Sequence, residues 1–304
     1  MFFKNLRIYK FTKPFLLSPE ELEEKLAEHA FQGCGKHDQS KYGWVEPLGR
    51  HGQMLTHVTG EHIMICGMKE EKILPASVVN DAVQEKVEEI EAKQGRKIFR
   101  KEKLQLKDEV TLTLLPKAFS RTSKTFAYFS PKENLLVVNA SSANKAEELL
   151  AYLRSSIESL PVIPPNTKLI SSDVMTLWLQ NQAAAEHFDI NQQCELYDPA
   201  ADSNVIRCKG QDLYSDEVAG HLAAGKQVKN LGVLWKDSLS CVIGDDLTVK
   251  SIKFTDMFME KAGERDAESA AEQFDQDFAV MSLELSRFIK HLFGAFGGLQ
   301  EKVV

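Results

Sequence analysis

Two helical patterns with a glycine between them constrain the fold of this chain more than any other feature of its sequence. Apolar residues recur at helical spacing before Gly95, and glycine is the residue that most often follows the end of a helix. A second apolar pattern stops at Pro116, which cannot continue a helix. Segments typical of strands flank both patterns, so we expect a helical hairpin arm at residues 75–116, inserted into a β-rich domain. The apolar positions are Val79, Val83, Val87 and Ile90 in the first helix and Leu106, Val110 and Leu114 in the second.

Positive charge is concentrated in the same region. Residues 93–132 hold eleven lysines and arginines against three acids, a net charge of +8, whereas the whole chain carries −7. An acidic protein with one basic segment is expected to present a localised positive surface, and the usual partner of such a surface is a polyanion, most often nucleic acid. The alternative for this segment alone is a helical hairpin whose charges simply face water.

The overall composition is that of a globular protein, with 43% hydrophobic and 27% charged residues. No run of about 18 apolar residues is present, and charged residues interrupt the N-terminal segment, so we expect neither a membrane span nor a signal peptide. The five cysteines are widely spaced and odd in number, which favours reduced thiols. These features predict a soluble cytoplasmic protein.

Outside the arm, the residue patterns predict an α+β fold with mixed or antiparallel sheets. Short strands are expected at residues 62–66 and 125–129, and residues 69–75 are expected to lead into the first arm helix. Three prolines at positions 161, 164 and 165 mark the best linker. The expected units are a central α+β domain at residues 1–74 and 117–165, the arm at 75–116, and a second α+β domain with a C-terminal helix at 166–304.

The C-terminal helix carries an apolar stripe whose members are separated by alternating steps of four and three residues. Such a stripe is typical of a helix buried in its own domain, and it is also typical of a helix that binds a partner. The sequence leaves both interpretations open. The residues of the stripe are Phe274, Phe278, Met281, Leu285, Phe288 and Leu292.

No motif of a known catalytic or cofactor site is present. The sequence has no G-x-x-x-x-G-K-[ST] phosphate loop, no G-x-S-x-G elbow and no H-E-x-x-H zinc motif. Cys34 and His37 have the spacing of half a zinc site, but the second half is missing. Glu70 and Glu71 precede Lys72 as in some nucleases, a pattern that chance explains in a chain this rich in glutamate and lysine. We therefore expect no catalytic residue, no metal, no cofactor and no enzymatic activity.

The basic residues predict contacts to phosphates, which are independent of base sequence. A turn between helices is a good place to meet a phosphate backbone without burying charge. Nothing resembles a zinc finger, a homeodomain arm or an RNP motif, so base-specific readout is not expected. The candidate DNA-binding residues are Lys93, Arg96, Lys97, Arg100, Lys101, Lys103, Lys117, Arg121 and Lys124, with Lys226 and Lys229 in the second half.

Several motifs, in register over essentially the full length, resemble those of the recombination-associated protein RdgC family of proteobacteria. They are Phe3-Lys4-Asn5-Leu6, Gly43-Trp44-Val45, Lys69-Glu70-Glu71-Lys72-Ile73-Leu74-Pro75, Gln94-Gly95-Arg96-Lys97, Leu106-Lys107-Asp108-Glu109-Val110, Leu114-Leu115-Pro116-Lys117-Ala118-Phe119-Ser120-Arg121, Lys145-Ala146-Glu147 and Phe274-Asp275-Gln276-Asp277-Phe278. The resemblance implies a cytoplasmic, nucleoid-associated protein that binds double-stranded DNA without strong sequence preference, and single strands more weakly. It also implies restraint of the recombinase RecA, and a horseshoe-shaped subunit whose homodimer forms a ring around DNA.

The resemblance also implies roles for individual residues. Phe119 corresponds to an aromatic at one dimer contact, the gate of the ring. A finger in the second half carries a Lys-Gln pair near the hole; here Gln211 is kept, its neighbour is Gly210, and Lys209 lies one position further back.

The residues themselves support a contact role for Phe119, because a large aromatic between charged neighbours is suited to a partner's pocket. A phenylalanine folded back under the hairpin is the alternative. The alternative function is an interaction protein that acts directly on the recombinase, with DNA binding secondary; affinity for bare DNA separates the two.

Overall fold

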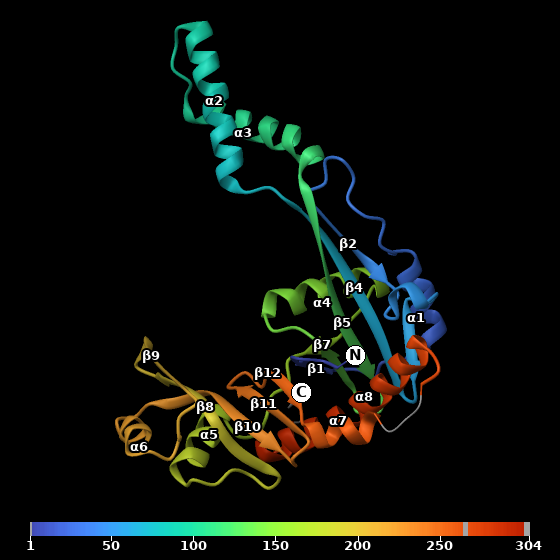
Figure 1. Ribbon diagram of the computed structural model, residues 1–304, viewed down its shortest axis with the longest axis vertical. Coiled ribbons are helices and arrows are strands. Elements are labelled where there is room, and N and C mark those ends of the chain that lie inside the picture. The colour runs from blue at the N-terminus through green and yellow to red at the C-terminus, as the bar shows by residue number, and fades with distance from the viewer. Residues whose placement is uncertain (1, 264–266, 301–304) are drawn as a thin grey trace.

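The computed structural model describes residues 2–263 and 267–300. Within them the chain forms two antiparallel sheets, helices packed against both, and a helical arm that projects from the body (Figure 1). The α+β class and the antiparallel sheets expected from the sequence are thus confirmed. Residues 264–266 and 301–304, which belong to the expected second domain, lie outside the described residues.

The first sheet contains seven strands in the order β2-β4-β5-β6-β1-β7, with β3 paired to β4. One of its faces is covered by helices α1 (Pro19–Ala27) and α4 (Ala143–Ile157), whose leucines pack with Phe129 and Trp44 in one core. The strands are β1 (Arg7–Phe11), β2 (Ser40–Val45), β3 (Thr56–Thr59), β4 (His62–Ile73), β5 (Phe119–Ser130), β6 (Leu135–Val138) and β7 (Val162–Ile163).

Strands β4 and β5 are longer than the sequence predicted. They pair without interruption from Ile63 opposite Phe129 to Ile73 opposite Phe119. The expected strands at residues 62–66 and 125–129 cover only the buried halves, and residues 69–73, which lead into the first arm helix as expected, are also strand. The outer halves carry charged and hydroxyl side chains and lack the alternation of apolar and polar residues that predicts a strand. This long ribbon carries the arm away from the body (Figure 1).

The arm consists of α2 (Ala76–Gln94) and α3 (Arg100–Leu114), as the two helical patterns predicted. Gly95 follows α2 with φ of 63°, a left-handed conformation that glycine adopts without a side-chain clash. The two helices bury Val79, Val83, Val87 and Val110 between them, and this small core is separate from those of the two sheets. A 3-10 turn, η2 (Leu115–Lys117), then leads into β5.

The second sheet has five strands in the order β12-β11-β10-β8-β9. Its strands are β8 (Phe188–Asp198), β9 (Ala201–Lys209), β10 (Gln227–Trp235), β11 (Leu239–Gly244) and β12 (Val249–Phe254), and its helices are α5 (Ser171–Gln180), α6 (Asp216–Ala223), α7 (Asp256–Gly263) and α8 (Ala270–Ala295). Among the described residues, no helix combines the length and apolar character that crossing a bilayer requires.

Helix α8 joins the two sheets into one core. Phe278 is 1% exposed and its ring lies 5.9 Å from that of Tyr128 on β5, while Phe288 packs against Trp235 on β10. The apolar stripe of the C-terminal helix is therefore buried inside the chain from Phe278 to Leu292, with Phe274 partly buried against the same core, which decides between its two interpretations. Leu6 and Val249 add two backbone hydrogen bonds, of 2.7 and 3.0 Å, between the segments before β1 and at the start of β12.

Candidate nucleic-acid interface

The exposed cations of the arm are concentrated on α3. Arg100, Lys101, Lys103 and Lys107 all have exposed side chains, because the side of the helix that faces α2 is occupied by Val110 and its apolar neighbours. Within residues 2–263 and 267–300, no carboxylate lies within ion-pair distance of these four cations. Their charges are therefore available to a ligand.

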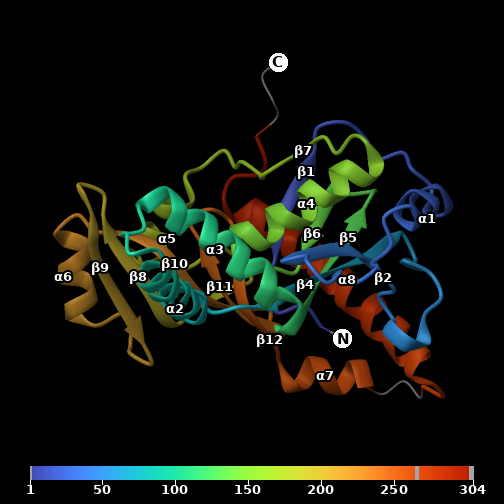
Figure 2. The same ribbon diagram turned by 90° about the horizontal axis from the view of Figure 1, so that it is seen from above.

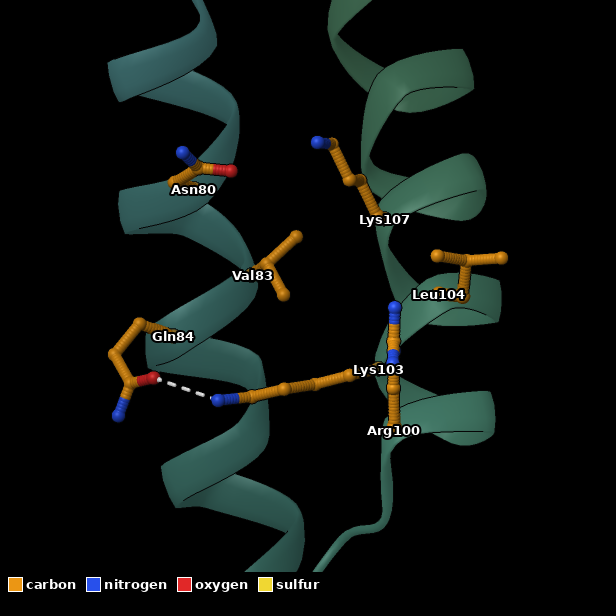
Figure 3. A pocket seen from close by; sticks show the side chains of 7 residues that line it. All are labelled: Asn80, Val83, Gln84, Arg100, Lys103, Leu104 and Lys107. Carbon is orange, nitrogen blue, oxygen red and sulfur yellow. Dashed lines mark hydrogen bonds between the residues drawn. The ribbon is translucent and has the colours of Figure 1, made fainter.

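Three of these cations line a groove between α2 and α3 (Figure 3). The groove has a volume of about 510 Å³, and none of its lining residues is acidic. The Lys103 Nζ reaches across it and donates a hydrogen bond of 3.4 Å to the Gln84 Oε1. The lining residues are Asn80, Val83, Gln84, Arg100, Lys103, Leu104 and Lys107.

Other predicted DNA-binding residues have acidic partners. Arg96 binds the Glu102 carboxylate through two hydrogen bonds of 2.9 and 2.7 Å, and these bonds hold the pKa of Glu102 below its usual value. Lys93 pairs with Glu89 one turn earlier on α2, and Arg121 binds Glu71 on β4 at 3.0 Å. Counting residues therefore overstates the free positive charge of this segment.

The three basic residues after the arm are spread out. Lys117 lies in η2 and is exposed. Arg121 and Lys124 are both exposed on β5, but odd and even positions of a strand point to opposite faces, so they do not form one surface. The Lys124 backbone carbonyl accepts a hydrogen bond from Lys145 on α4.

Candidate residues of the second half lie on and around the second sheet. Lys209 is at the end of β9, where it lines a groove of about 290 Å³ with Arg207 and Lys250. Gln211 donates to the Glu217 carboxylate at 2.9 Å. Gly210 has φ of 67°, a conformation in which a lysine side chain is strained, so the glycine suits this turn.

Lys226 and Lys229 differ in exposure. Lys226 is only 9% exposed and offers little surface to a polyanion. The Lys229 side chain is exposed and its Nζ lies 5.9 Å from the centre of the Tyr197 ring. Lys97, at the tip of the arm, is also exposed.

Sequence reasoning missed several groove residues. Lys107 was counted in the basic segment but was not among the candidate DNA-binding residues, although it continues the helical spacing of Arg100 and Lys103. Lys250 gave no signal, because only the pairing of β11 with β12 brings it beside the β9 groove. Asn80 and Gln84 are polar positions of α2 that become part of a site only when α3 packs alongside.

Phe119 is 84% exposed at the start of β5. Its cross-strand partner Ile73 is 50% exposed, so two apolar side chains lie unburied at the base of the arm. The side chain of Phe119 is therefore not folded under the hairpin. An exposed apolar pair at the end of a projecting ribbon is typical of a contact with another protein surface.

The acidic and thiol residues noted in the sequence are engaged in structural bonds. The Glu70 carboxylate accepts the Cys34 backbone N–H at 2.8 Å, and the Cys34 thiol donates to the Glu70 carbonyl. Glu71 binds Lys69 and Arg121, and these partners hold its pKa below the usual value. Among the described residues, no group of three or more potential metal ligands occurs.

Comparison with known proteins gives a full-length match. The family model described as "Putative exonuclease, RdgC" matches residues 1–299. The recombination-associated protein RdgC of Aeromonas hydrophila is 47% identical over 303 residues, which cover 100% of both chains. Those of Psychromonas ingrahamii and Proteus mirabilis are 45% and 42% identical, over 99% of this chain and 99% and 100% of their own lengths. The chain belongs to the RdgC family.

Proposed function

We propose that this protein binds double-stranded DNA without sequence preference and does so without cutting it. The observation that carries the proposal is the row of exposed, unpaired cations on α3 in a chain of net charge −7. Lysine and arginine on such a row neutralise phosphates and release condensed counterions, whichever bases are present. A lower charge density makes single strands a weaker ligand for the same row.

The positions of the arm and the second sheet support the proposal that a duplex binds between them. The two lie at opposite ends of the long axis in Figure 1, and seen from above the arm lies over the second sheet (Figure 2). We propose that Lys209, Lys229 and Lys250 on the second sheet contact the duplex from the side opposite α3. The subunit then has the form of a horseshoe, with residues 75–116 as the arm and β8–β9 as the finger.

The proposal includes a homodimer that closes the horseshoe into a ring. Phe119 and Ile73 expose apolar surface at the base of the arm, which a second copy of the chain would bury. A closed ring retains DNA topologically, in the cytoplasm at the nucleoid, and occupies duplex that the RecA recombinase needs. Restraint of recombination follows from occupancy of DNA and requires no contact with the recombinase.

Two triple variants with equal charge loss test the DNA interface. Arg100→Gln, Lys103→Gln and Lys107→Gln remove unpaired cations, whereas Lys93→Gln, Arg96→Gln and Arg121→Gln remove cations that already have acidic partners. The first set is expected to reduce the slope of log affinity against log salt by up to about 2.7, since each lost contact removes about 0.9. The second set is expected to change it much less.

The readout is fluorescence anisotropy of a labelled duplex over a range of salt concentrations, with circular dichroism as the control for folding. Equal effects of the two sets would mean that pairing does not decide which cations bind. An unchanged slope in the α3 set would move the interface away from the arm.

A further inference from the structure

The groove between α2 and α3 contains more than charge. Leu104 is 63% exposed beside the three cations, and Val83 from α2 also lines the groove (Figure 3). Leu104 is not part of the small core that holds the arm together, which is built from Val79, Val83, Val87 and Val110 with partly buried neighbours. Its exposure therefore has no explanation in the stability of the arm.

The length of the stripe that these residues form on α3 matches that of a short extended peptide. Arg100, Lys103, Leu104 and Lys107 are spaced by three, one and three residues, which places them on one stripe of α3. At about 1.5 Å of rise per residue the stripe is about 10 Å long. An extended peptide covers that length with about three residues, at about 3.3 Å each.

A phosphate backbone would use the cations but would leave Leu104 in contact with water. A leucine with lysine and arginine beside it is instead complementary to an apolar side chain that has acidic neighbours, a kind of segment that clusters of basic residues recognise. Gln84 and Asn80 add amide groups that can hydrogen-bond to a peptide backbone.

We propose that this groove binds a short acidic segment of a partner protein, with one apolar side chain of that segment packed on Leu104. The acidic side chains of that segment pair with Arg100, Lys103 and Lys107, so the segment competes with DNA for the same cations. A protein carrying such a segment would release the arm from the duplex. This inference concerns a second ligand and does not depend on a ring or a dimer.

The test uses two fluorescently labelled synthetic peptides of equal charge. In one a single phenylalanine is flanked by aspartates, and in the other a serine replaces the phenylalanine. The full-length protein is expected to bind the first at least about fivefold more tightly, the effect of burying part of one apolar side chain. Leu104→Asn is expected to abolish that difference and to leave duplex binding unchanged.

Leu112→Asn is the matched control, because Leu112 is a 51% exposed leucine of α3 that does not line the groove. It is expected to keep the preference for the phenylalanine peptide. Equal affinity of the parent for both peptides, or no binding of either peptide alongside normal duplex binding, would overturn the proposal. So would an identical preference in the Leu104 and Leu112 variants. A protein that binds the peptide but no duplex would instead contradict the proposed function.

Discussion

Arg96 and Glu102 face each other across the turn between α2 and α3, where two hydrogen bonds of 2.9 and 2.7 Å join the guanidinium to the carboxylate. Glu102 also accepts the Phe99 backbone N–H at the start of α3. The arginine at the tip of the arm therefore helps to fix the turn, and its charge is partly compensated. Ion pairing of this kind lowers the free positive charge of a basic segment.

Removing the carboxylate should release that charge. We expect Glu102→Gln to raise the affinity for a short duplex and to increase the salt slope by up to about 0.9, the contribution of one added phosphate contact. Glu109→Gln, on an exposed acid of the same helix, changes the net charge equally and serves as the control. A salt slope that rises equally in both variants would show that Glu102 does not keep Arg96 from contacting a phosphate.

Phe278 should contribute strongly to the stability of the core where α8 joins the two sheets. The side chain is 1% exposed and contacts Tyr128, His57 and His62 from the first sheet. Truncation of a buried phenylalanine to alanine costs about 3–5 kcal/mol of unfolding free energy, and we expect that loss for Phe278→Ala in urea denaturation. Phe99→Ala, at a 73% exposed position, should change stability by less than about 0.5 kcal/mol. A loss of unfolding free energy below about 1 kcal/mol for Phe278→Ala would contradict this role of Phe278.

Two histidines should make the contact between the two sheets sensitive to acid. Burial lowers the pKa of His57, against the opposing effect of Asp275, and burial lowers the pKa of His62, against those of Glu133 and Glu61. The unfolded chain therefore binds these protons more readily than the folded protein does. Stability is fully present above the unfolded pKa of about 6.5, and it falls as the pH drops from there toward the lower pKa values of the folded state.

Urea midpoints at about pH 7.5 and about pH 5.5 measure this fall, on either side of the unfolded pKa. We expect His62→Gln to reduce the difference between the two midpoints, whereas His51→Gln, at an exposed position, should leave it unchanged. A parent protein with the same midpoint at both pH values would exclude a role for buried neutral histidine.

No DNA cleavage is expected, although the matching family model carries the word exonuclease in its description. Glu70 and Glu71 occupy adjacent positions of β4 and so face opposite sides of the ribbon, each engaged by other residues. Plasmid DNA incubated with the protein and magnesium should remain intact. Nicking that disappears in a Glu70→Gln, Glu71→Gln variant would establish a nuclease site at this position.

The sequence predicted elements whose signals are local. Gly95 and Pro116 bounded the arm helices correctly, because a left-handed residue and a missing N–H act within a few residues. The outer half of β4 was missed, since its charged residues are stabilised by partners far away in sequence: Lys69 pairs with Glu148 on α4, and Glu71 pairs with Arg121 on β5. Helix α7 was not predicted at all; it is only eight residues long, too short for a helical repeat of apolar positions to show.

The candidate site was predictable in composition and not in detail. Charge density located the basic segment at residues 93–132, and helical spacing would have grouped Lys107 with Arg100 and Lys103. Which cations have acidic partners depends on the α2–α3 turn and on the pairing of β4 with β5, and neither follows from residue counts. The burial of Lys226 likewise depends on the packing around the second sheet.

Retention on closed-circular DNA tests the central claim most directly. The protein is loaded on closed-circular and on linearised plasmid, challenged with high salt, and the bound fraction is measured over time. The parent should dissociate from linear DNA and remain on circles, because a closed ring leaves linear DNA only by sliding off an end.

Phe119→Ala should keep the melting temperature within a few degrees and short-duplex affinity within about fivefold, since an exposed side chain is removed and the phosphate contacts persist. It should lose the retention on circles. Equal dissociation of the parent from both DNA forms, or retention of Phe119→Ala on circles as long as the parent, would contradict a ring with its gate at Phe119.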